Sequence, residues 1–487
     1  MVRYRFREGV HVSSDGDDVI ITTPYAARLN QIRRIIRFHS VTDSFKNFLE
    51  SLSENGVCCE LFTINEDPCA QGLEKSDAVF VLEDLYAKGL LSTEIGNSKS
   101  AAIRLDPVKS CLRLRRAPLG DYRIRFSRFA SIYPCSDGLS ISSPLSSANL
   151  HLIDRRLFFL LTELASACTE ESLRQALPDD LLVHFDDLIS LLLSSGVAGL
   201  CDEQGVADID RHAVEAGWTS RDLAFHCQTR EHEIDLFRME SSQTAVIQEP
   251  LPAKHQRIIL QTVALPEPSR IHCDLNFFQV IRDRHTIRTY QNQPISSAVL
   301  SALLWHSMRI KEEIICDPGL PRSYEGLLRP VASAGALHSI ELYLCVHRCH
   351  GLQPGFYHYD SGRHCLGKLS DLSEPCLRML ELAAASTCRA PQAASVSPGQ
   401  AQQPDVLIVM ASRYARQAGL HRQTGLSYAL ILKDVGSIYQ QLYLVATALG
   451  LAPCGLSFGS SELFEQASGL PTHLECSVGE FMIGNPG

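Results

Sequence analysis

Short alternating stretches, each followed by amphipathic segments, dominate the first half of the chain. Residues 10–22 and 130–142 each predict two strands joined by a Ser-Asp-Gly turn, because Asp-Gly between alternating apolar residues is a strong hairpin signal. Ser/Thr-Pro follows both hairpins, and the next stretches carry leucines three and four apart, which predicts short amphipathic helices. The repeated pattern therefore predicts two winged-helix-like modules in tandem.

Winged helices often bind DNA, and the segment in the position of a recognition helix argues against that role here. Residues 184–200 carry Asp186 and Asp187 but no lysine or arginine. The chain has a formal net charge of −10 at pH 7, so it has no basic surplus to neutralise phosphates. We therefore expect these modules to bind a peptide or a protein partner along a strand edge or helix groove, and no nucleic acid.

The hydrophobic pattern changes in the second half. Residues 340–346 alternate apolar with other side chains and predict a half-buried strand, whereas 428–450 is apolar on nearly every side. Such a helix lies in a core or between subunits. Residues 386–405 are rich in Pro, Ala, Gln and Ser, a composition that predicts a mobile surface loop. The α+β organisation that we expect has winged-helix-like modules at 1–115 and 116–227, a linker at 228–272, and a domain with a helix-flanked mixed sheet at 273–487.

The composition of the chain indicates the class of protein and its cellular compartment. The 487 residues are 45% hydrophobic and 21% charged, as in ordinary globular proteins of two or three domains. The first residues alternate like a strand instead of forming a signal peptide, and no apolar stretch of about eighteen residues could span a membrane. The 17 cysteines include no Cys-x-x-Cys pair, which favours free thiols over disulfides or zinc. We expect a cytoplasmic protein without membrane association.

Two kinds of segment suggest a ligand site. The turn at 282–290 places a hydroxyl among guanidinium groups, a donor set suited to a phosphate monoester, although a basic turn can also be plain solvated surface. Small residues at 332–336, just before the predicted strand, and again at 450–459 would let backbone N–H groups approach a flat or charged ligand. Taken alone, the first of these small-residue stretches is equally compatible with a tight turn.

Together these segments resemble the nitroreductase-like flavoprotein superfamily. Residues 284–288, Arg-His-Thr-Ile-Arg, are similar to its Arg-Arg-Ser-x-Arg phosphate motif, and 434–452 resembles its Asp-x-Gly-His-x-x-Gln-Asn…Leu-Gly-Leu-Gly segment. The stretch from Arg329 to Glu341, with 355–360 after it, looks like the Arg-Pro-x-x-Ser-Gly-Gly…Glu and Gly-x-Tyr-x-Tyr-Asp patterns of azoline dehydrogenases of ribosomal-peptide biosynthesis. The tandem N-terminal modules are similar to those of cyanobactin-type thiazoline oxidases.

The resemblance implies a homodimer that binds FMN and oxidises thiazoline or oxazoline rings of a precursor peptide, in company with other peptide-modifying enzymes. FMN is expected in preference to FAD because no Gly-x-Gly-x-x-Gly turn occurs. Several azoline dehydrogenases carry a Lys-Tyr pair that is absent here, which leaves His421 and Tyr428 as candidate proton acceptors. The implied FMN-binding residues are Arg284, His285, Thr286, Arg288, Ser333, Ala334, Gly335, His338, Gln441, Gly450, Leu451 and Gly455.

Two other functions stay open at this point. An NAD(P)H-dependent nitroreductase or flavin reductase would share the flavin motifs but would not need the tandem modules. A flavin-free scaffold that binds precursor peptides would need the modules but not the flavin motifs.

Overall fold

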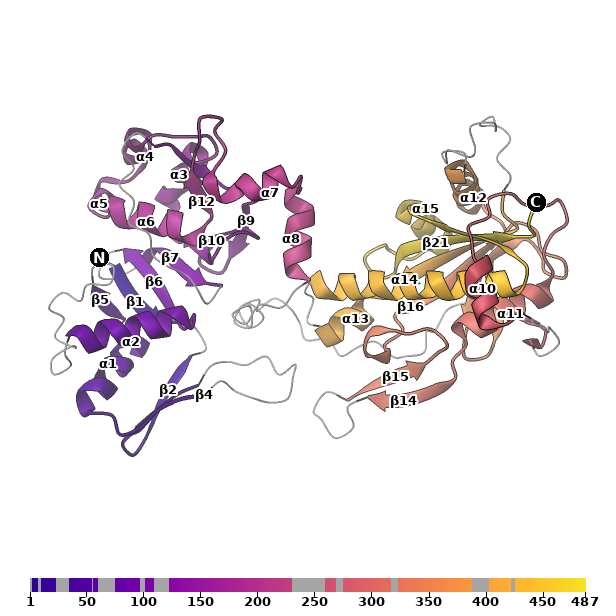
Figure 1. Cartoon of the computed structure of the whole chain (residues 1–487), viewed down its shortest axis with the longest axis horizontal. Coiled ribbons are helices and arrows are strands. Elements are labelled where there is room, and N and C mark those ends of the chain that lie inside the picture. Colours follow the sequence, from indigo (N-terminus) through magenta and orange to yellow (C-terminus); the bar gives the residue numbers. More distant parts are fainter. Residues whose placement is uncertain are drawn as a thin grey trace. The chain divides into compact units, whose positions relative to one another are not determined.

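The chain folds into two compact units, Met1–Thr244 and Ala245–Gly487 (Figure 1). Each unit is built around a sheet of its own. The computed structural model describes residues 2–7, 10–22, 35–54, 56–59, 75–96, 101–108, 122–229, 259–268, 275–316, 323–387, 403–421 and 425–487. The predicted boundary between the two modules, at residue 115, lies outside these ranges, as does most of the surface loop predicted at 386–405.

The framework of the first unit is a seven-stranded antiparallel sheet in the order β5-β1-β6-β7-β11-β10-β9. Two smaller sheets, β2-β3-β4 and β12-β8, complete the strands of the unit. The strands are β1 (Val2–Phe6), β2 (His11–Asp15), β3 (Asp18–Thr22), β4 (Ile35–Phe38), β5 (Val57–Cys59), β6 (Leu91–Gly96), β7 (Ala101–Pro107), β8 (Ile124–Phe126), β9 (Ser131–Cys135), β10 (Gly138–Ser142), β11 (Ala148–Leu152) and β12 (Ala198–Leu200).

Both predicted hairpins form, as β2–β3 and β9–β10. The predicted amphipathic segments are helical, and their leucines enter a single core shared by both halves of the unit. Because β7 pairs with β11, the strands of the two predicted modules belong to one sheet. The helices are α1 (Asp43–Glu54), α2 (Lys75–Ala87), α3 (Phe158–Glu163), α4 (Glu170–Ala176), α5 (Asp179–Leu182), α6 (Phe185–Ser195), α7 (Arg211–Glu215) and α8 (Ser220–Gln228).

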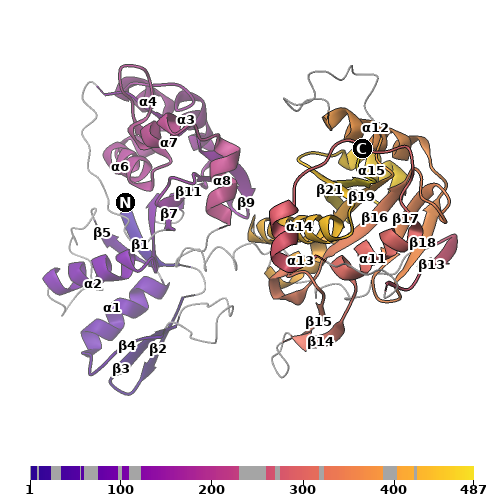
Figure 2. The same ribbon diagram turned by 45° about the vertical axis from the view of Figure 1, so that its right-hand side comes forward.

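A second seven-stranded sheet, in the order β13-β18-β17-β16-β19-β21-β20, runs through the other unit (Figure 2). The predicted α+β class is confirmed, but all pairings in this sheet are antiparallel, whereas a mixed sheet was expected. Consecutive strands such as β16, β17 and β18 follow one another as neighbours and need no crossover. The strands are β13 (Gln261–Ala264), β16 (Ile340–Val346), β17 (Gly355–Asp360), β18 (Cys365–Ser370), β19 (Val406–Ser412), β20 (Ala452–Leu456) and β21 (Cys476–Gly484), with β14 (Glu312–Cys316) and β15 (Tyr324–Leu328) as a separate pair.

Helices cover both faces of this sheet. One core joins α11 and α14 to alternate residues of β16, and another joins α12 and α15 to the residues between them. All seven residues of β16 are therefore buried, and the prediction of a half-buried strand is wrong. Within the predicted linker 228–272, β13 pairs with β18 of this unit. The helices are α10 (Phe277–Asp283), α11 (Ser297–Met308), α12 (Glu374–Thr387), α13 (Tyr414–His421), α14 (Gly425–Ala448) and α15 (Ser461–Ser468).

The long predicted helix forms as α14, and one of its faces is buried in the core. In the single chain its opposite side is open, since Leu432 is 41% exposed. Gly450, with φ of +70°, follows the helix, and the Leu451 N–H returns to the Ala446 carbonyl at 2.9 Å, as in a left-handed C-terminal cap. Among the described residues, no helix combines the length and apolar character needed to cross a membrane.

Candidate functional site

The basic turn that follows α10 lies against the C-terminal half of α14. Arg284 is half-buried, with its guanidinium carbon 5.3 Å from the centre of the Tyr443 ring, whereas Arg288 is exposed. In the described part of the chain, neither arginine forms an ion pair with a carboxylate. The exposed His285 turns back on its own segment, with Nδ1 2.7 Å from the Asp283 carbonyl. Two guanidinium groups thus remain available for an anion.

Tyr443 joins this turn to the far end of the chain. Its hydroxyl lies 3.0 Å from the Thr286 hydroxyl and accepts the Gly455 N–H at 2.8 Å. The Ile287 N–H bonds to the Pro453 carbonyl at 3.0 Å. Sequence reasoning missed Tyr443, although its position one helical turn after Tyr439 was a signal, since both rings then share a face of α14.

Half of the second small-residue segment is a strand, which corrects the loop expected at 450–459. Residues 452–456 form β20 at the edge of the sheet. The N–H groups of Leu451 and Gly455 are already bonded within the chain, and the Leu451 side chain is buried in the core. Gly450 acts in the termination of α14 rather than in an open cradle.

The first small-residue segment is a strained turn held by a buried carboxylate on α14. Asp434 accepts hydrogen bonds from the Ser333 hydroxyl at 2.6 Å and from the Ala334 N–H at 3.0 Å. Burial raises the pKa of Asp434 above its usual range. Three residues that follow have positive φ values, and two of them are not glycine, which is a costly backbone arrangement that often marks functional sites. They are Gly335 (+63°), Ala336 (+53°) and His338 (+44°).

His338 is buried beside guanidinium groups. Burial, together with the charges of Arg329 and Arg416, lowers the pKa of His338 to about 3, so its ring is neutral at physiological pH. The backbone N–H of His338 donates to the Ser333 hydroxyl at 3.0 Å, so His338 is bonded to the strained turn. Sequence analysis placed His338 among the ligand-binding residues; its described contacts hold the turn in shape.

A buried polar cluster lies behind this turn, and sequence reasoning found only part of it. Glu341 lies 3.6 Å from Arg413 and 3.2 Å from His358. Arg416 donates to the Leu337 carbonyl at 2.5 Å and to the Glu325 carbonyl at 2.7 Å, and burial lowers its pKa to about 10. Arg413 and Arg416 lie 70 and more residues beyond Glu341, so no local pattern could place them there.

The expected site residues fall into separate groups along α14. Asp434 and Tyr443 are nine residues apart, which corresponds to about 13 Å along a helix axis. Gln441 belongs to neither group, because its side-chain amide donates to the His306 carbonyl at 3.0 Å. The structure thus joins Arg284, Thr286 and Gly455 through Tyr443. It joins Ser333 and Ala334 through Asp434, and His338 bonds to Ser333.

The two candidate proton acceptors, His421 and Tyr428, lie on α13 and α14. His421 is the last residue of α13, and its side chain lies outside the described residues. Tyr428 is 39% exposed, and its pKa is raised by burial, so its phenol carries a proton at neutral pH. Such a phenol donates a proton more readily than it accepts one.

Glu480 on β21 is a third titratable group, and sequence reasoning missed it. Its side chain shares a face of the sheet with Val409 and Met482, which belong to the core of α12 and α15, so it points away from α14. Its backbone N–H donates to the Tyr439 hydroxyl at 2.9 Å, and Tyr439 in turn donates to the Leu456 carbonyl at 2.8 Å. The side chain is 4% exposed, and in the described structure its Oε1 has no hydrogen-bond partner. Burial raises the pKa of Glu480 to about 7, the range in which a carboxylate serves as a general base.

Comparisons with known proteins find similar proteins for about half of the chain. A Methanocaldococcus jannaschii protein assigned as a nitroreductase is 26% identical over 204 residues, which are 42% of this chain and 87% of that protein. An assigned nitroreductase from Ralstonia eutropha is 19% identical, with 49% of this chain and 98% of that chain covered and a TM-score of 0.35. The E. coli microcin synthetase McbBCD complex with truncated pro-MccB17 is 17% identical over 54% of this chain and 86% of the matched chain, with a TM-score of 0.32.

Two family models also match. Residues 281–484 match the nitroreductase family, and residues 124–235 match the cyanobactin oxidase ThcOx. The first match spans the basic turn, α14 and the strained turn, and the second spans the second hairpin and the helices after it. The chain therefore carries a nitroreductase family domain at residues 281–484 and a cyanobactin oxidase ThcOx domain at residues 124–235.

Proposed function

We propose that this protein is an FMN-dependent oxidoreductase that dehydrogenates thiazoline or oxazoline rings of a ribosomally made peptide to thiazoles or oxazoles. The observation that carries the proposal is the presence of two family domains in one chain. A nitroreductase domain alone is compatible with many redox reactions, whereas the cyanobactin oxidase domain supports a modified peptide as the substrate.

The residues of the basic turn fit an FMN phosphate. Arg284 and Arg288 lack carboxylate partners within the described structure and can form charge-assisted bonds to a phosphate monoester. The Thr286 hydroxyl beside them is oriented by Tyr443. The Nδ1–H of the exposed His285 is already donated to the Asp283 carbonyl, so His285 could donate to a phosphate through Nε2 only as an imidazolium. We assign phosphate binding to these four residues, and we assign the approach of the flavin ring to the strained turn at 333–338.

Bound FMN would supply a two-electron acceptor for the hydride that leaves the azoline ring. The protein itself must then take up a ring proton. The pKa of Glu480 is raised to about 7, but its side chain lies on the sheet face of α12 and α15, opposite α14, so we do not assign this task to Glu480. His421 and Tyr428 remain candidates for the same role. Single variants would distinguish them, because only replacement of the true proton acceptor should abolish ring oxidation.

We further propose that the chain acts as a homodimer and that the first unit binds the precursor peptide. Large apolar side chains are exposed on α10 and α14, which pack against each other, and a second chain would cover them. They include Phe277, Phe278, Ile281 and Leu432. The division into modules at 1–115 and 116–227 is part of this proposal, together with association with other peptide-modifying enzymes.

The test of the reaction uses purified full-length protein, FMN, oxygen and a peptide that contains one thiazoline. Mass spectrometry should show the loss of two hydrogen atoms for each ring. A thiazole-containing peptide serves as the unreactive control. An unchanged thiazoline mass with FMN-loaded, folded protein would contradict the proposal.

The test of the cofactor site compares single alanine variants. Replacement of Arg284 or Arg288 removes a charge-assisted contact of roughly 1.5–3 kcal/mol, which corresponds to about tenfold to hundredfold weaker FMN binding. Arg282→Ala is the matched control, because Arg282 is exposed and its Nε lies 3.6 Å from Asp283. Equal FMN affinity in the wild type and both variants, measured by fluorescence titration, would show that the turn is solvated surface.

A second candidate function is reduction of nitro compounds or free flavin with NAD(P)H. It is favoured by the 26% identical relative from Methanocaldococcus jannaschii, which matches 204 residues, or 42% of this chain. Rapid NAD(P)H consumption with a nitroaromatic compound, without azoline oxidation, would support this function. Absence of flavin after reconstitution would instead support a peptide-binding scaffold.

A further inference from the structure

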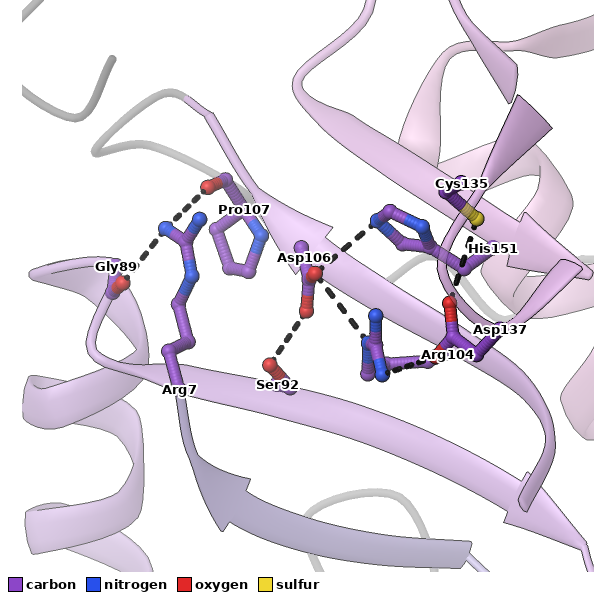
Figure 3. A network of polar contacts seen from close by, with 9 residues as sticks. All are labelled: Arg7, Gly89, Ser92, Arg104, Asp106, Pro107, Cys135, Asp137 and His151. Atoms are coloured by element: carbon purple, nitrogen blue, oxygen red, sulfur yellow. Dashed lines mark hydrogen bonds and ion pairs between the residues drawn. The ribbon is translucent and has the colours of Figure 1, made fainter. Parts of the chain in front are cut away.

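The turn of the second hairpin brings together three side chains that can bind a metal ion. Cys135 ends β9, Asp137 lies in the turn, and His151 comes from β11. Their ligand atoms all lie within 4.8 Å of one another. The cluster, which Figure 3 shows from close by, belongs to the first unit, whereas the site described above belongs to the second unit.

Strand register explains how these residues meet. Cys135 lies opposite Gly138 on β10, and His151 lies opposite Ser140 on the other side of the same strand. Cys135, Gly138, Ser140 and His151 therefore share one face of the sheet, since residues two apart on a strand point the same way. Glycine is required at position 138 because a Cβ there would collide with the Leu152 carbonyl oxygen.

His151 is oriented as a metal ligand. Its Nε2 lies 3.1 Å from Oδ2 of Asp106, so this nitrogen carries the proton and Nδ1 carries the lone pair. Nδ1 is buried and has no hydrogen-bond partner in the described structure. Figure 3 shows the His151 ring between Asp106 and Cys135. Metal-binding histidines commonly have such a carboxylate behind the ring.

The other two ligands have a suitable separation. The Cys135 sulfur lies 3.3 Å from Oδ1 of Asp137, with the thiol as donor. Zinc bonds of about 2.3 Å to sulfur and 2.0 Å to oxygen, at a tetrahedral angle, place these two atoms about 3.5 Å apart. A metal ion could therefore replace the thiol proton with little movement of either side chain.

We propose that Cys135, Asp137 and His151 form a zinc-binding site, with Asp106 as the residue that orients His151. A thiolate, an imidazole and a carboxylate are the ligand types that zinc accepts, and a fourth position stays open to solvent. The thiolate and Asp137 together balance the charge of the ion. Arg104 bonds to Oδ2 of Asp137 at 2.9 Å, which leaves Oδ1 for the metal.

The first hairpin provides an internal comparison. Its Ser-Asp-Gly turn has Ser13 in the position of Cys135, so the repeated sequence lacks the sulfur ligand there. Because the ligands follow a Cys-x-Asp spacing with a distant histidine, no Cys-x-x-Cys pattern marks this site in the sequence. The ligands come from different strands, and only the pairing of β9, β10 and β11 unites them.

The test measures zinc binding by the full-length, reduced protein. A chelator first removes bound metal, zinc is then added, and dialysis removes the excess. Wild type should retain one zinc ion more per chain than Cys135→Ser, by elemental analysis after dialysis. Cys201→Ser is the matched control, because Cys201 is a half-buried thiol in the same unit with Asp202 and Asp208 nearby but no histidine. Asp106→Asn should weaken zinc binding by about tenfold to hundredfold in a chelator competition.

Cobalt substitution gives a readout that does not depend on counting ions. A sulfur-to-cobalt charge-transfer band should appear in wild type and in Cys201→Ser, and should be absent in Cys135→Ser. Equal zinc content in wild type and Cys135→Ser, or a cobalt band that survives this substitution, would overturn the site. If Cys135→Ser does not fold by circular dichroism, His151→Gln decides: an unchanged cobalt band in that variant would also overturn it.

Discussion

Single side chains on α14 connect parts of the sequence that are far apart. Tyr443 bonds to Thr286, 157 residues earlier, and to Gly455. Asp434 holds the turn at Ser333, 101 residues earlier. The basic and small-residue motifs were visible in the sequence because each is local. The tyrosine and aspartate contacts could not be predicted, since they depend on how α14 lies against the sheet.

Loss of the Tyr443 hydroxyl should affect both stability and the basic turn. Tyr443→Phe leaves the Gly455 N–H without its acceptor, which should lower the free energy of unfolding by about 1–3 kcal/mol. Trp305 in α11 reports on this unit once Trp218, the other tryptophan, is replaced by phenylalanine. Urea denaturation followed by Trp305 fluorescence measures the change. Tyr428→Phe, at a position of the same helix and the same unit that is 39% exposed, is the control, and equal effects of the two substitutions would refute the role of Tyr443.

Glu480 should make stability depend on pH. Its pKa is raised to about 7 in the folded chain from 4.5, so the folded state binds a proton more tightly than the unfolded state. Stability from this group is therefore present at low pH and is lost as pH rises from about 4.5 to about 7. Glu480→Gln should remove that loss, which is on the order of 3 kcal/mol.

The measurement compares urea midpoints at pH 5 and pH 8 in the same Trp218→Phe background. The difference between Glu480→Gln and its parent should be larger and more favourable at pH 8. Glu381→Gln, at an exposed position of α12, should show no such difference. A variant that is equally destabilised at both pH values would mean that the carboxylate fits its site in the ionised form.

At the scale of elements, β16 shows where a pattern can mislead. Its alternation predicted one buried and one open face, but Tyr343 and Cys345 enter a second core made by α12 and α15. The strand was identified from its own residues, whereas its burial depends on helices located far along the chain. The hairpins β2–β3 and β9–β10 were predicted well, because their turns are encoded by adjacent residues.

Replacing either of two glycines of the α14 region by alanine should change the free energy of unfolding, with opposite signs at the two positions. Gly450 has φ of +70° and open space where a Cβ would lie, so Gly450→Ala adds only backbone strain, about 1–2 kcal/mol. Gly436 lies inside the helix, also with open space, and Gly436→Ala should stabilise the unit by about 0.5–1 kcal/mol. Urea denaturation followed by Trp305 measures both. A loss of stability for Gly436→Ala would show that a second chain packs against this position.

At the scale of the whole molecule, the two units carry different matches and different kinds of residue. Every residue that we assign to FMN lies after residue 280, and the hairpin repeat with its metal-ligand cluster lies before residue 230. The two units separate at residue 244, and β13 belongs to the sheet of the second unit. A cut that preserves the second sheet must therefore fall before residue 259.

A protein that begins at Ala245 should bind FMN and oxidise a short azoline peptide, but should use long precursor peptides poorly. The reason is that recognition by the first unit is remote from the reacting ring. Its loss raises KM and leaves kcat unchanged if those contacts are equally strong in the ground and transition states. Steady-state kinetics on matched short and long peptides, after circular dichroism confirms folding, measures this split. The division of labour fails if the truncated protein is folded, yellow and equally active on both peptides, or if the isolated first unit binds DNA rather than peptide.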